Sequence, residues 1–233
     1  MTEATFIKGS CANKFSKKTK PRIFYISNKA ITYHNGIPSV AAALKQCLER
    51  DEDDTVILCS NLMDVDRTRT SLNLLEMPSE LYVPYLENEI PSIQRKKELL
   101  EGSGGSIIVS DYRSFRGCES SHCIIFTDLE NPIAGTIMAE MLSRTMVDLD
   151  IIALPQTDAT NPIPTNPIQT AFITWTHRGL VDSITVDFQN EDESSITFDI
   201  QLPTKTESVK IETMEFDFSL SYYSMEIQQS KIQ

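Results

Sequence analysis

The chain has 233 residues and a formal net charge of −12, and 40% of its residues are hydrophobic. Its apolar runs are shorter than the roughly 18 residues of a membrane-spanning helix, and its N-terminus lacks the apolar core of a secretory signal, so we expect no membrane span. The acidic balance disfavours autonomous binding to nucleic acid, because like charges repel. Five cysteines at irregular spacings and three scattered histidines predict no metal site and favour a reducing, intracellular compartment, either cytoplasmic or nuclear.

Strand and helix patterns alternate along the first part of the chain. Residues 1–20 carry a cluster of lysines and are expected to form a basic flexible tail. The apolar run 21–27 predicts a strand, and apolar residues at helical spacing predict a helix over 38–48. A second buried strand is expected at 55–61, and a second helix at 63–77, which Pro78 stops.

The next elements continue the alternation. We expect, in order, a short edge strand at 80–89, a helix at 91–101, strands at 106–111 and 122–129, a helix at 132–147, and a strand at 149–154. Short apolar strands that alternate with helices imply βαβ units. Residues 21–154 are therefore predicted to form an α/β domain with a mainly parallel sheet and helices on both faces.

The pattern changes at Pro155. Residues 155–168 contain four prolines and are expected to form a linker. Beyond it the apolar residues alternate with period two, first at 171–177, which predicts a β-rich extension over 169–227 with antiparallel strands. A hairpin loop is expected at 189–194, and residues 228–233 are expected to be frayed.

A short polar segment between the strands 106–111 and 122–129 is the first candidate for a functional site. Arg113 and Arg116 suit phosphate groups, because a guanidinium offers two donors to two oxygens. Gly117 permits a tight turn, and Glu119 can accept from a sugar hydroxyl. The segment is expected at the carboxyl edge of the sheet, where α/β proteins bind ligands. The alternative is a surface turn in which Arg116 and Glu119 form a weak ion pair.

Three stretches resemble motifs of UvrD-type superfamily 1 helicases, in the order of the family. Residues 106–126, "SIIVSDYRSFRGCESSHCIIF", resemble motif V, with Arg116 in place of its Lys, Gly117 on its Gly and Glu119 on its Glu. Ser143-Arg144-Thr145 resembles the Thr-Arg-Ala core of motif VI, and residues 54–73 resemble motif IV.

The resemblance implies a RecA-like fold of the P-loop NTPase type, corresponding to the second motor domain of those helicases. In that family, ATP binds between two such domains. By position, Arg144 would be the catalytic arginine that stabilises charge on the γ-phosphate, and Glu119 would contact the nucleotide, together with Arg113, Arg116 and Gly117. The resemblance also implies a second protein domain that covers this face, and it leaves nucleic acid as a partner that the net charge disfavours.

The chain departs from the family where the chemistry would be completed. It has no G-x-x-x-x-G-K-[ST] loop and no strand that ends in a paired Asp–Glu for magnesium, and Cys59 stands where motif IV has an arginine. We therefore expect a half-motor domain that does not hydrolyse ATP alone. It would bind nucleotide weakly or act as a protein-interaction module in a larger NTPase-like protein. ATP is the implied cofactor, with magnesium supplied by another domain; otherwise none is expected.

Alternatives remain open from the residues alone. Arg144 could be a solvated helical charge that pairs with Glu140, four positions earlier. The chain could be an independent doubly wound enzyme or binding protein, with its ligand near residues 110–119. It could also be a structural protein that binds a partner through the acidic region from Pro155 onward. This region contains 12 acidic and 4 basic residues.

Overall fold

The computed structural model describes residues 20–50, 55–90, 92, 94, 95, 98, 107–129, 134–155, 167–213 and 216. Several predictions fall on residues outside these ranges: the basic tail up to residue 19, most of the helix 91–101, the core of the linker, the last part of the β-rich extension and the frayed end 228–233. Among the described helices, none combines the length and the apolar character that crossing a membrane requires.

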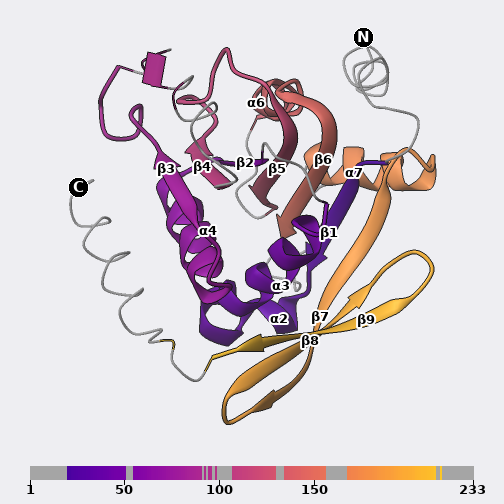
Figure 1. Ribbon diagram of the computed structural model, residues 1–233. Helices are drawn as coiled ribbons and strands as arrows, with labels where there is room; N and C mark the ends of the chain where they lie inside the picture. The colour runs from indigo at the N-terminus through magenta and orange to yellow at the C-terminus, as the bar shows by residue number, and fades with distance from the viewer. Residues whose placement is uncertain are drawn as a thin grey trace.

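A single nine-stranded sheet organises the described chain (Figure 1). Its strands are β1 (Arg22–Ile26), β2 (Thr55–Cys59), β3 (Ser79–Tyr82), β4 (Ile107–Asp111), β5 (Ser120–Asp128), β6 (Thr145–Leu154), β7 (Asp182–Asp192), β8 (Ser195–Gln201) and β9 (Thr206–Glu212). They are ordered β3-β4-β2-β5-β6-β1-β7-β8-β9. The strands from β3 to β7 in this order are parallel, and β8 and β9 continue antiparallel.

Helices cover both faces of the sheet. On one face lie α3 (Ile37–Cys47) and α4 (Leu62–Leu74), preceded by the short α2 (Asn28–Ile31) and the turn η1 (Tyr33–Gly36). On the other face lie α6 (Gly135–Leu142) and α7 (Pro167–His177). The strands β2 and β4 are buried along their whole length, as expected for parallel strands covered on both sides. The predicted α/β architecture with a mostly parallel sheet is thereby confirmed.

The C-terminal strands extend the same sheet. Strand β7 pairs in parallel with β1, from Arg22 opposite Asp182 to Ile26 opposite Val186. Strands β7, β8 and β9 then form the antiparallel part of the sheet, which confirms the predicted antiparallel pattern. The turn between β7 and β8 is tighter than the expected loop 189–194, since β7 runs to Asp192.

One element prediction was wrong, and one predicted helix is shorter than expected. Residues 171–177 belong to helix α7 and not to a strand. The buried residues Ile168, Ala171, Phe172 and Trp175 follow helical spacing, and this pattern outweighs the partial alternation. The helix expected over 132–147 ends at Leu142, because strand β6 begins at Thr145.

The segment between β4 and β5 is a crossover and not a turn at one edge. Both strands run parallel to β2, which lies between them, so the chain must return from the carboxyl edge to the amino edge. Tyr112 and Phe115 of this segment are buried in the apolar cluster of the α6 face. The predicted placement of the whole segment at the carboxyl edge was therefore wrong, and its residues are divided between the two edges.

Candidate functional site

Glu119 and Arg144 lie side by side at the amino edge of β5 and β6. The two strands pair from Ser120 opposite Thr145, so the residues just before them are neighbours. The backbone amide of Ser120 donates to the carbonyl of Arg144 at 3.0 Å. Residues 25 positions apart, derived from two separate sequence motifs, are thus joined at one point.

Helix α6 adds a carboxylate to this point. Glu140 lies in its last turn and accepts from Arg116 through Nε at 2.8 Å and Nη2 at 3.2 Å. The same carboxylate lies 3.5 Å from Nη2 of Arg144. We call Arg116, Glu119, Glu140 and Arg144 the amino-edge corner. The expected pairing of Arg144 with Glu140 is confirmed, and Glu140 also joins Arg116 to the group.

The corner carries two guanidinium groups on one shared carboxylate. The Arg116 side chain is 62% exposed and that of Arg144 is 21% exposed. The buried Nε of Arg144 has no hydrogen-bond partner among the described residues. Burial raises the pKa of Cys123 behind the corner to about 12, and the charges of Arg144 and Glu119 act on it in opposite directions. The guanidinium groups of Arg116 and Arg144, beside the exposed carboxylate of Glu119, suit a ligand that has both anionic and hydroxyl groups.

The other two predicted residues, Gly117 and Arg113, contribute no side chain to the amino-edge corner. Gly117 has φ +78°, and a Cβ there would meet no atom within 4 Å. It therefore serves the turn and not a close approach. Arg113 lies at the carboxyl end of β4, where its Nε donates to the Tyr112 hydroxyl at 2.7 Å and its guanidinium lies 4.9 Å from the Tyr85 ring centroid. Arg113 is thus separated from Glu119 by the crossover.

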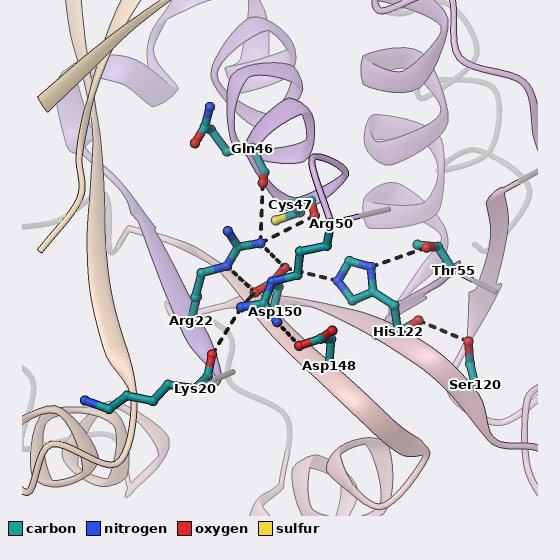
Figure 2. Close-up of polar contacts among 10 residues, drawn as sticks. All are labelled: Lys20, Arg22, Gln46, Cys47, Arg50, Thr55, Ser120, His122, Asp148 and Asp150. Carbon is teal, nitrogen blue, oxygen red and sulfur yellow. Dashed lines mark hydrogen bonds and ion pairs between the residues drawn. The ribbon is translucent and has the colours of Figure 1, made fainter. Parts of the chain in front are cut away.

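A buried polar network lies at the same amino edge (Figure 2). Arg22 of β1 holds Asp150 of β6 through Nε–Oδ1 at 2.8 Å and Nη2–Oδ2 at 2.6 Å. His122 of β5 places Nε2 3.1 Å from Asp150 Oδ2. Arg50, which follows α3, pairs with Asp148 and lies 3.6 Å from Asp150. Asp150 and His122 are fully buried.

Sequence reasoning missed this network. Burial alone would raise the pKa of Asp150, but hydrogen bonds from Arg22 and His122, with the charges of Arg22 and Arg50, hold that pKa below its ordinary value. The available signal was the pair Asp148 and Asp150 at the start of the apolar run of β6, since charged side chains in a buried strand need a partner.

A buried carboxylate lies at the carboxyl edge, in the first turn of α4. Asp64 is only 3% exposed. Its carboxylate accepts from Ser60 at 3.0 Å and Asn61 at 2.9 Å. Burial raises its pKa to about 6, against the opposing charge of Arg67. Asp111 at the end of β4 is also buried, and its Oδ1 caps the crossover by accepting from the amides of Arg113 and Ser114.

The described residues contain no group of three or more His, Cys, Asp or Glu side chains placed to hold a metal ion. The amino-edge corner consists of two arginines and two glutamates.

Comparisons with known proteins give a limited result. No protein family model matches the chain, and no curated protein matches it. Among solved structures, the chain is similar to the C-terminal domain of a possible DNA helicase from Lactobacillus plantarum WCFS1. The two are 17% identical, the match covers 68% of this chain and 90% of that domain, and the TM-score is 0.43. At this level the likeness carries no argument about function.

Proposed function

We propose that the chain is the second, RecA-like half of a nucleotide-dependent motor of helicase type, without an ATPase site of its own. The proposal joins the motif resemblance to one observation. The hydrogen bond from Ser120 to the carbonyl of Arg144 brings the two residues with nucleotide roles in that family, Glu119 and Arg144, to the same point.

The chemistry of the corner supports an incoming phosphate. Glu140 is shared by Arg116 and Arg144, so the two guanidinium groups lie close together, where both can donate to the same anion. Phosphoryl transfer depends mainly on positioning and on charge stabilisation, which an arginine can supply from a second domain. Glu119 is exposed beside them and offers an acceptor to a ribose hydroxyl. The phosphate-binding loop and the magnesium ligands would come from a companion domain.

Binding of a fluorescent ATP analogue, with and without magnesium, tests the proposal. We expect weak, saturable binding by the wild-type chain and no hydrolysis. Arg144→Ala should weaken binding about tenfold, the effect of a charge-assisted hydrogen bond. Arg178→Ala serves as the matched control, since Arg178 is an exposed arginine just after α7 and should leave binding unchanged. Absence of binding, or equal binding by Arg144→Ala and wild type, would contradict the proposal.

A further inference from the structure

The pairing of β5 and β6 is irregular immediately beside the corner. Ser120 pairs with Thr145, but the next pair is His122 with Asp148. One residue of β5 therefore opposes two residues of β6. Such bulges bend a strand and change the direction of the side chains next to them, and they are frequent beside functional sites. This bulge begins one residue after Glu119 and Arg144.

The side chain of His122 connects the bulge to both neighbouring strands (Figure 2). Its Nε2 lies 3.1 Å from Asp150 of β6, and its Nδ1 lies 3.3 Å from the hydroxyl of Thr55 on β2. Its backbone carbonyl accepts from the Ser120 hydroxyl at 3.1 Å. A short path of hydrogen bonds thus runs from the buried network through His122 and Ser120 to the carbonyl of Arg144.

Stability alone is a poor explanation for this network. Burying ion pairs costs desolvation energy, and apolar replacements are often at least as stable. A buried polar network whose hydrogen bonds require a fixed geometry does, however, favour one strand register over its alternatives. The register that it favours here is the one that places Glu119 beside Arg144.

We propose that His122 is a positioning residue for the amino-edge corner. Its hydrogen bonds to Asp150 and Thr55 fix the bulge, and the bulge fixes where Glu119 and Arg144 present their side chains. This inference rests on the proposed function, because the corner is the site that it positions.

The test compares two substitutions at His122 in the full chain, with binding of the fluorescent ATP analogue as the measurement. His122→Ala should weaken binding about fivefold, close to the effect of one hydrogen bond. His122→Gln should recover most of the affinity, since its amide nitrogen can still donate to Asp150. If His122 only stabilised the fold, His122→Gln would not restore affinity when the two variants are compared at the same folded fraction.

Ser71→Ala provides a control for stability. Ser71 is a buried residue of α4 whose hydroxyl donates to the carbonyl of Ile37 at 3.0 Å, and it has no link to the bulge. We expect it to lower the melting temperature without changing affinity. If His122→Ala binds as wild type, or if Ser71→Ala weakens binding equally, the positioning role is overturned.

Ser120→Ala keeps the test decisive if His122→Ala does not fold. It removes only the hydroxyl that holds the His122 carbonyl, and it should weaken binding about twofold to threefold. Unchanged affinity in Ser120→Ala would contradict the inference. If Arg144→Ala loses affinity but the variants at Ser120 and His122 bind as wild type, the positioning role is overturned and the proposed function stands. Absence of wild-type binding would overturn the proposed function itself.

Discussion

Arg22 and Asp150 stand directly opposite each other on β1 and β6, and their side chains form a two-point ion pair with distances of 2.8 and 2.6 Å. The same guanidinium lies 3.3 and 3.4 Å from the carbonyls of Gln46 and Cys47 at the end of α3. One arginine therefore joins a strand pair to the negative end of the helix that covers it.

Removing one partner of this pair should be strongly destabilising. Asp150→Ala leaves Arg22 and Arg50 without their shared carboxylate, and we expect a loss of about 3–5 kcal/mol in the free energy of unfolding. Urea denaturation measures this loss. The exposed pair of Arg116 and Glu140 provides the contrast, since Glu140→Ala should change stability little. Similar losses of unfolding free energy in Asp150→Ala and Glu140→Ala would contradict the structural role of the buried pair.

Asp64 should make stability fall as pH rises between about 4 and 6. Its pKa is raised in the folded state from 3.8 to about 6, so the folded chain binds more protons than the unfolded chain in that window. Above it, the ionised carboxylate costs at most about 3 kcal/mol. Asp64→Asn does not titrate, so the unfolding free energy of the variant minus that of wild type should rise across the window. A difference that stays flat in thermal melts from pH 4 to 7 would contradict this.

Gly36 and Gly117 should respond differently to alanine. Both have positive φ, +74° and +78°, so alanine at either should cost about 1–2 kcal/mol in backbone strain. At Gly36 the new Cβ would also lie 2.2 Å from Cδ1 of Ile31, so Ile31 must move. We expect the melting temperature to fall further in Gly36→Ala than in Gly117→Ala; the reverse order would contradict the packing around α2 and α3.

Filling the gap between α6 and α7 should stabilise the chain. A cavity of about 70 Å³ lies between Met138, Ala139 and Leu142 on α6 and Ile168, Phe172 and Trp175 on α7. Ala139→Met adds apolar contacts there and should raise the melting temperature by about 2–4 °C, equivalent to about 1 kcal/mol. Thr136→Met places the same side chain at an exposed position of α6 and should have no such effect. A lower melting temperature in Ala139→Met would mean that the helices cannot accept the added volume.

The sequence predicted those parts of the fold that local patterns determine. The apolar runs of β2, β4 and β5 identified buried strands, because a strand covered on both faces has no polar alternation. Helix α7 was missed because Ala171, Ile173 and Trp175 fit period two over a short window, although the buried side chains of the segment follow helical spacing. The crossover could not be predicted, since its path depends on β2 lying between β4 and β5.

The candidate site was predictable only where motifs carried it. Glu119 and Arg144 were found by resemblance, and their adjacency follows from strand pairing. Glu140 was noticed as a neighbour of Arg144 along the helix, whereas its bond to Arg116 joins residues 24 positions apart. The pair of Arg22 and Asp150 spans 128 positions, so no local pattern could assign its partners.

The place of β1 within the sheet has a consequence for synthesis of the chain. Among the described strands, β1 is synthesised first, yet its neighbours are β6 and β7, whose paired residues follow 128 and about 160 positions later. During translation, β1 must therefore wait for β6 on one side, and still longer for β7 on the other. Contacts of such long range slow folding and expose apolar strand edges meanwhile. The nascent chain should thus depend on chaperones most strongly just before β7 emerges, and release from them should coincide with closure of the sheet around β1.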